Sequence, residues 1–145
     1  MKLVKTLCVI VLGIMFMSCN SQDKSSKKIL NTSISKIEVL DFHATHRCMT
    51  CNAIEANTKY TLNTYFKEAL SKGKITFQVV NVDKKENEKI AKKFQASSTA
   101  LFLNVIKNGE EKQIDLTEFA FLNGNNKEVF SKKLKAKIDA ELKNI

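Results

Sequence analysis

The sequence predicts an α/β domain, a small mixed β-sheet flanked by helices on both faces. Strand-like apolar segments alternate with segments of helical spacing along the chain. Their order is strand, helix, strand, helix, strand, strand, helix. The two strand–helix–strand crossings require parallel pairing. The Asn108-Gly109 pair predicts a tight hairpin and therefore one antiparallel pairing. Gly73, Gly109 and Gly124 all fall at expected breaks between elements, which supports this order.

The first half of the domain is expected to carry a buried strand, a long helix and a second strand. Residues 37–42 alternate and then run apolar, which is typical of a buried strand. Apolar side chains over residues 50–71 keep to one side of a helix, and Gly73 supplies its stop. Residues 75–82 are the strongest strand candidate in the chain.

The second half is expected to carry a short helix, a hairpin and a last helix. Asp83 and Glu86 resemble a capping box for a short helix that ends near Phe94. Residues 100–106 and 110–116 have strand character on either side of the hairpin turn. The last helix is predicted by apolar residues that recur every four positions: Phe130, Leu134, Ile138 and Leu142.

Composition limits the classes of protein that fit. A length of 145 residues suits one domain, and 43% apolar residues supply one modest core. The formal charge of +9 comes from lysines that are interleaved with acids and apolar positions. They form no basic stripe with stacking aromatic residues, so we expect no nucleic-acid partner.

The N-terminus is typical of an export signal. Residues 1–18 carry Lys2 and Lys5 ahead of an apolar core at 7–17. This core is too short for a mature membrane span, which needs roughly 20 apolar residues. We therefore expect a lipoprotein signal peptide over residues 1–18.

The end of the signal resembles a relaxed lipobox, Phe16-Met17-Ser18-Cys19, whose cysteine is lipidated and becomes the new N-terminus. A plain signal peptide cut nearby is the alternative. Residues 19–35 are rich in Ser, Lys, Asn and Gln and are expected to tether the domain at 36–145. The protein would then be exported and lipid-anchored in the cell envelope, facing the periplasm. Cys8 would leave with the signal.

The free thiols of the mature chain would be Cys48 and Cys51, two cysteines separated by two residues where the first strand gives way to the first helix. Unpaired backbone N–H groups and the helix dipole at a helix N-terminus favour a thiolate. His46 and Arg47 add positive charge that lowers a thiol pKa. We therefore expect a redox-active pair in a compartment where disulfides persist.

Two other interpretations of the pair stay open. Cys48 and Cys51 could form an inert structural pair. They could also hold a soft metal ion or arsenite together with His43 or His46, with or without Met49, because thiolates, imidazoles and a thioether suit such ions. A metal site needs these ligands to converge on one point, whereas redox chemistry needs only the two sulfurs and an exposed Cys48.

The whole pattern resembles the thioredoxin fold over roughly residues 36–145. Four motifs beyond the two cysteines carry this resemblance: Val79-Val80-Asn81-Val82-Asp83, Ala91-Lys92-Lys93-Phe94, Leu101-Phe102-Leu103 and Lys107-Asn108-Gly109-Glu110. The segment from Phe42 to Glu55 also resembles a small group of thioredoxin-like envelope proteins labelled ArsF-type or "nitrophenyl compound nitroreductase subunit". Nitroreduction is not inferred, because the chain carries no visible flavin-binding signature.

The resemblance implies roles for the two cysteines. Cys48 would be the attacking thiolate and Cys51 the resolving thiol of a thiol–disulfide oxidoreductase. Its substrate would be a thiol or disulfide of a partner protein, and a membrane electron donor or acceptor would return it to its starting state. The resemblance implies no cofactor besides the disulfide itself.

Some positions depart from the thioredoxin pattern. Thioredoxins carry Trp before the first cysteine and Gly-Pro between the two, where this chain has Arg47, Met49 and Thr50. Their cis-proline loop corresponds to the region around Thr99, and this chain contains no proline. A cis bond at another residue costs about 2.5–4 kcal/mol. We therefore expect Thr99 to modulate the site and a dedicated partner to replace general protein substrates.

Overall fold

The computed structural model describes residues 35–145. The expected export signal, the lipidated Cys19 and the tether up to residue 34 lie outside the described residues. Within residues 35–145, no helix has the length and apolar character needed to cross a membrane.

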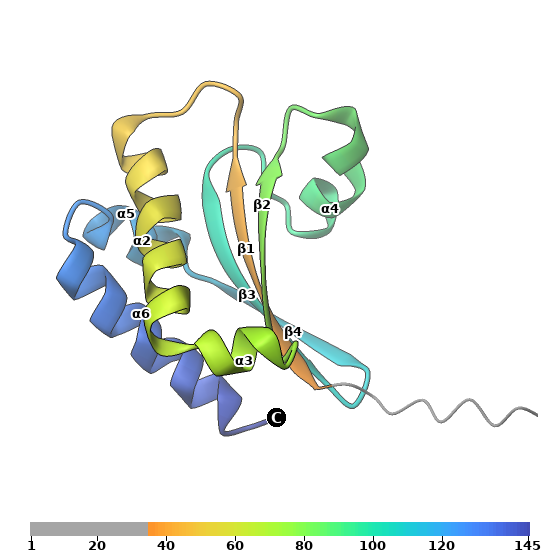
Figure 1. Ribbon diagram of the computed structural model, residues 1–145. Helices are drawn as coiled ribbons and strands as arrows, with labels where there is room; N and C mark the ends of the chain where they lie inside the picture. The colour runs from red at the N-terminus through yellow and green to blue at the C-terminus, as the bar shows by residue number, and fades with distance from the viewer. Residues whose placement is uncertain (1–34) are drawn as a thin grey trace, which may run out of the picture. The chain divides into compact units, whose positions relative to one another are not determined.

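The described chain is built on one four-stranded sheet in the order β2-β1-β3-β4 (Figure 1). Strands β1 (Lys36–His43) and β2 (Ile75–Asn81) are parallel, whereas β3 (Ala100–Lys107) runs antiparallel to both β1 and β4 (Glu110–Asp115). The hairpin forms at the predicted turn, where Asn108 and Gly109 both have positive φ. This strand order, with helices on both faces, is the predicted thioredoxin fold.

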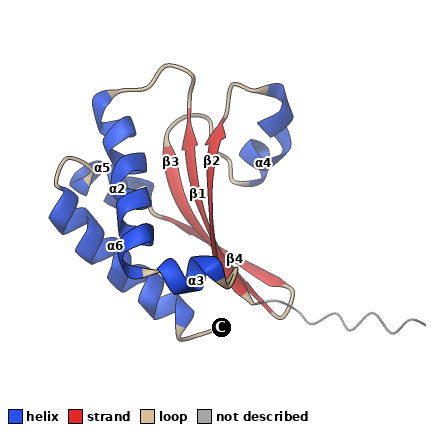
Figure 2. Ribbon diagram, in the orientation of Figure 1, coloured by secondary structure: helices blue, strands red, loops and turns tan. Residues whose placement is uncertain are grey.

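Most helices cover one face of the sheet (Figure 2). These are α2 (Met49–Tyr65), α3 (Lys67–Ser71), α5 (Thr117–Asn123) and α6 (Lys127–Leu142). They bury the larger core, which joins strand residues such as Val39 to helix residues that include Ile54, Leu62, Phe130 and Leu134. Hydrophobic burial on this face therefore fixes α2, the helix that follows the two cysteines, against β1.

The opposite face carries the 3-10 helix η1 (Lys85–Asn87) and α4 (Glu88–Lys93). Under them lies a smaller core in which three aromatic rings contact one another. Phe42, Phe94 and Phe102 have ring centroids 5.3 to 5.9 Å apart, in tilted or edge-on pairs.

The prediction of one long helix over residues 50–71 is wrong in one respect, because the structure has two helices there, α2 and α3. Phe66 leaves helical geometry, with φ −127° and ψ 21°, and only 5% of it is exposed. Its ring enters the same core as Leu62 and Leu70, so the apolar spacing continues across the break. Sequence periodicity therefore gives no sign of the change in direction.

Two further expectations need correction. Asp83 does not cap a helix: η1 begins after Lys84 without a side-chain cap, and the Asp83 carboxylate instead accepts a hydrogen bond from the Thr45 backbone N–H. The seven-residue helix α5 was not predicted. It buries one residue fully, Ala120, which is too few to give a visible helical period.

Candidate functional site

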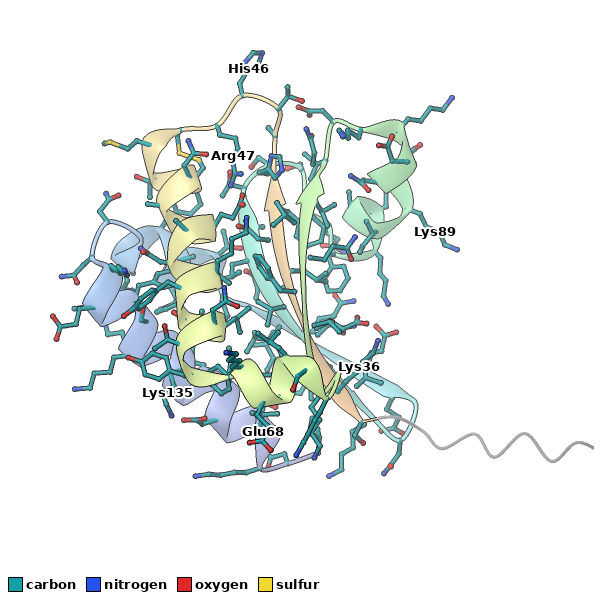
Figure 3. All side chains as sticks on the ribbon, in the orientation of Figure 1. Lys36, His46, Arg47, Glu68, Lys89 and Lys135 are labelled. Carbon is teal, nitrogen blue, oxygen red and sulfur yellow. A yellow bond between two sulfur atoms is a disulfide. The ribbon has the colours of Figure 1, made fainter. Side chains whose placement is uncertain are left out.

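Cys48 and Cys51 lie at the start of α2 and are joined by a disulfide (Figure 3). Cys48 is the N-cap residue, with extended backbone, and its Sγ accepts a hydrogen bond of 3.0 Å from the Cys51 backbone N–H. The predicted placement of the first sulfur at a helix N-terminus is confirmed. This arrangement follows from the sequence because a buried strand ends at His43 and the helix begins at Met49.

The two cysteines differ in exposure. Cys48 is exposed, whereas Cys51 is only 7% exposed and faces the protein interior. Met49, the next residue after Cys48, is 82% exposed. A partner can therefore reach the Cys48 side of the disulfide, while Cys51 is shielded from it.

The helix favours negative charge at Cys48. Helix α2 has 17 residues and no acidic residue in its first turn, so nothing there offsets the positive end of its dipole. When the disulfide is reduced, the Cys51 N–H and the dipole both stabilise a thiolate at Cys48.

The Arg47 side chain extends from the loop toward the body of the domain (Figure 3). Its guanidinium forms an ion pair with Glu55 and donates a hydrogen bond of 3.1 Å to the Cys51 carbonyl oxygen. Glu55 also pairs with Lys59, and these contacts hold the pKa of the Glu55 carboxyl below its usual value even though its partial burial acts in the opposite direction. Arg47 thus secures the first turns of α2, and its influence on Cys48 stays a prediction.

Asp41 is the residue of this region that sequence analysis missed. It alternates along β1 with Ile37 and Val39, which belong to the core under α2, so it faces the same helix. It is fully buried, and neither carboxylate oxygen has a hydrogen-bond partner among residues 35–145. The available signal was an acid between Leu40 and Phe42, in the apolar half of the strand.

Burial raises the pKa of Asp41 to about 7. The positive charge of Arg47 opposes this rise, the negative charge of Glu55 adds to it, and Lys59 opposes it weakly. The same Arg47 also contacts the Cys51 carbonyl oxygen and Glu55, so the charges that act on Asp41 belong to the first turns of α2 and the loop before them. The site therefore combines an exposed sulfur, a buried sulfur and a buried acid that titrates near neutral pH.

The two histidines occupy different environments. His46 is exposed and points away from the body of the domain at the tip of the loop (Figure 3). His43 is partly buried, and its Nδ1 lies 2.8 Å from the Ala44 carbonyl oxygen. The loop between them is anchored because the Thr45 N–H donates to Asp83 over 2.6 Å, a bond that is the main cause of the lowered pKa of Asp83.

The ligand set of the metal-binding alternative is not gathered in this structure. Within residues 35–145, no group of three or more His, Cys, Asp and Glu side chains is placed to hold a metal ion. Cys48 and Cys51 are bonded to each other, and His46 faces solvent.

Thr99 lies in the loop that leads into β3. The loop is at the same end of the sheet as the disulfide, because the first residue of β3, Ala100, pairs with Phe42 near the end of β1. Thr99 and its neighbours line a groove of about 480 Å³ that extends to Gln113 and Asp115 on β4. Every peptide bond within the described residues is trans. A modulating role for Thr99 stays a prediction.

Comparisons with known proteins give structural likenesses only. No protein-family model and no curated protein matches the chain. The chain is similar to a malarial protein, with 23% identity over 61% of this chain and 94% of that one and a TM-score of 0.39. It is also similar to Fasciola hepatica thioredoxin, with 24% identity over 68% of this chain and 86% of that one and a TM-score of 0.41. Likenesses of this size carry no conclusion about function, which rests on the site itself.

Proposed function

We propose that this protein is a thiol–disulfide oxidoreductase that acts on a partner protein through Cys48 and Cys51. The observation that carries the proposal is the asymmetry of the pair. The exposed cysteine caps a helix, and the buried cysteine contacts Arg47, whose charge also acts on the buried Asp41. An inert structural disulfide needs neither an exposed sulfur nor a buried acid in the same charge network.

In the reducing direction the Cys48 thiolate attacks one sulfur of a partner disulfide. A mixed disulfide forms, and the other partner sulfur leaves as a thiolate that takes up a proton. Cys51 then loses its proton, attacks the Cys48 sulfur and releases the second partner thiol. The partner disulfide gains two electrons, and this protein ends with the Cys48–Cys51 disulfide.

Asp41 is proposed to receive the Cys51 proton. A base works best when its pKa lies near the operating pH, and Asp41 has a pKa of about 7. Cys51 is too buried to lose a proton directly to solvent. Return to the dithiol state needs a second dithiol as electron donor, which we propose to be a membrane protein.

The cell envelope is the proposed place of action. A signal at residues 1–18, lipidation at Cys19 and a tether over 19–35 would hold the domain beside the membrane that supplies its electrons. The narrower relation to the ArsF-type envelope group belongs to this proposal too, on the strength of the Phe42–Glu55 motif.

A trapping experiment tests the assignment of the two sulfurs. In the processed, lipidated chain, whose only free thiols are expected to be Cys48 and Cys51, the reduced Cys51→Ser variant should accumulate a mixed disulfide with a protein disulfide such as insulin, because nothing displaces Cys48. The matched Cys48→Ser chain should form little, because Cys51 is buried. Equal trapping by both variants, or by neither, would contradict the proposal.

The reduction potential decides the direction of electron flow. A value near or below about −250 mV supports a reductant, and a value near about −120 mV supports an oxidant. Metal content is measured on the same preparation. Stoichiometric metal that blocks alkylation of both cysteines would replace this proposal with the soft-metal alternative.

A further inference from the structure

A groove of about 420 Å³ is lined by helices α2 and α6, which contact each other (Figure 1). Aromatic rings line it from α2, and ammonium and hydroxyl groups line it from α6. The lining residues that matter are Tyr60, Tyr65, Lys127, Ser131, Lys132 and Lys135. None of them belongs to the disulfide site.

The groove carries more positive than negative charge. Lys127 lies over the Tyr60 ring, with Nζ 3.5 Å from its centroid. Lys132 has no ion-pair partner among residues 35–145, whereas Lys135 pairs with Asp139 over 2.5 Å. Glu128 is the only acid among the lining residues within the described chain. The groove therefore attracts an anion.

The buried hydroxyl of Ser131 has no hydrogen-bond partner within residues 35–145, which is an independent indication of a ligand. The residue is 2% exposed. A serine inside a helix usually donates to a backbone carbonyl or points to solvent, and Ser131 does neither. Ser131 borders the groove, so a rotation about its χ1 would present the hydroxyl to a ligand oxygen, which would accept the hydrogen bond that the protein leaves unmade.

We propose that this groove binds a phosphate group. Lysine ammoniums bind phosphate as point charges, and a hydroxyl can add a neutral hydrogen bond to one of its oxygens. Lys127, Ser131 and Lys132 all belong to the first turns of α6 and all line the groove. A free phosphate ester and the headgroup of an acidic phospholipid both offer this chemistry.

Intrinsic fluorescence reports on this groove without a label. The full sequence contains two tyrosines and no tryptophan, and both tyrosines line the groove. They are 41% and 46% exposed, so a ligand can reach them. Phosphate that draws Lys127 off the Tyr60 ring should change tyrosine emission.

The experiment titrates the full chain, kept in neutral detergent micelles, with two probes. Inorganic phosphate represents the free ligand, and phosphatidylglycerol added to the micelles represents the headgroup. Sodium chloride at matched ionic strength controls for screening, and diacylglycerol controls for a lipid without phosphate. We expect a saturable change in emission with at least one probe, and the probe that produces it identifies the source of the phosphate.

Variants locate the response. The double change Lys127→Gln and Lys132→Gln should raise the apparent dissociation constant about tenfold or more, and Ser131→Ala about fivefold. Lys89→Gln is the matched control, because Lys89 is exposed on α4, on the other side of the sheet from Lys135 (Figure 3). No saturable change with either probe, or an equal response in the double variant, would overturn the proposal.

Discussion

Two fully buried polar residues on neighbouring strands, Asn104 and Asp41, differ in the hydrogen bonds that their side chains make. Asn104 on β3 faces the α4 side of the sheet, and its side-chain amide donates to Glu38 over 2.9 Å and to Glu111 over 3.1 Å. Asp41 on β1 faces α2, and its carboxylate accepts nothing from residues 35–145. Both hydrogen bonds of Asn104 come from its amide nitrogen, and its Oδ1 accepts none within residues 35–145, whereas no side-chain atom of Asp41 has a partner there.

The difference separates a framework residue from a titrating one. A neutral amide has two N–H groups, so Asn104 serves two carboxylates whose remaining charge is met by Lys36 and Lys93. An isolated carboxylate in the interior can avoid its desolvation cost only by binding a proton. Burial alone therefore does not mark a functional group here, whereas burial of an ionisable group without partners does.

The largest expected effect is that of Asp41→Asn on stability. The pKa of Asp41 is about 7 in the folded state, against 3.8 for an exposed aspartate carboxyl. The free energy of unfolding of the parent therefore has its full value below about pH 4. It falls by about 4 kcal/mol in all as the pH rises through 7 and Asp41 ionises. Asparagine never ionises, so the variant should be about 4 kcal/mol more stable than the parent at pH 8.5 and similar to it at pH 4.

Urea unfolding of the oxidised full chain at the two pH values measures this difference. Glu118→Gln is the matched control, because Glu118 is an exposed acid on α5 whose loss should leave the pH dependence unchanged. An Asp41→Asn variant that is no more stable than the parent at pH 8.5 would show that the protein does compensate this carboxylate.

A smaller effect, of opposite sign, is expected from Asn104→Leu. Leucine fills a similar volume and donates nothing, so Glu38 and Glu111 lose a hydrogen bond that lowers the pKa of each. The cost should be about 2 kcal/mol at pH 7. It should shrink below about pH 4, where protonated carboxyls no longer repel each other.

The measurement is again urea unfolding, with Asn104→Asp as a companion. A third carboxylate in the same cluster should destabilise more than leucine at pH 7 and recover more on acidification. If Asn104→Leu were as stable as the parent at pH 7, the amide would be dispensable and the contrast with Asp41 would fail.

Much of the fold was predictable because its signals are local. Asn108-Gly109 needs positive φ at both positions, and few other residue pairs adopt that turn. Cys48 lies at a helix N-terminus because a buried strand ends five residues before it. The break between α2 and α3 at Phe66 could not be predicted from the sequence. Both helices bury side chains in the same core, so the apolar spacing continues across the break.

The site was only partly predictable because its electrostatics are not local. The sequence places Arg47 beside Cys48, and that adjacency suggested a direct effect on the thiol. In the fold Arg47 turns inward to Glu55, eight residues further along, and its charge acts on Asp41. Whether Asp41 is compensated thus depends on a loop conformation that no local pattern encodes.

This network gives the last and smallest prediction, in which two substitutions move one pKa in opposite directions. Arg47→Gln removes a positive charge that lowers the pKa of Asp41 and should raise it, whereas Glu55→Gln removes a negative charge and should lower it. Each shift is expected to be on the order of one unit, measured by carbon-13 NMR of the Asp41 carboxyl. Each change breaks the same Arg47–Glu55 pair, so structural loosening alone would shift both variants alike. Opposite shifts can arise only from the sign of the charge, and parallel shifts would mean that packing of α2, rather than its charges, sets the protonation of Asp41.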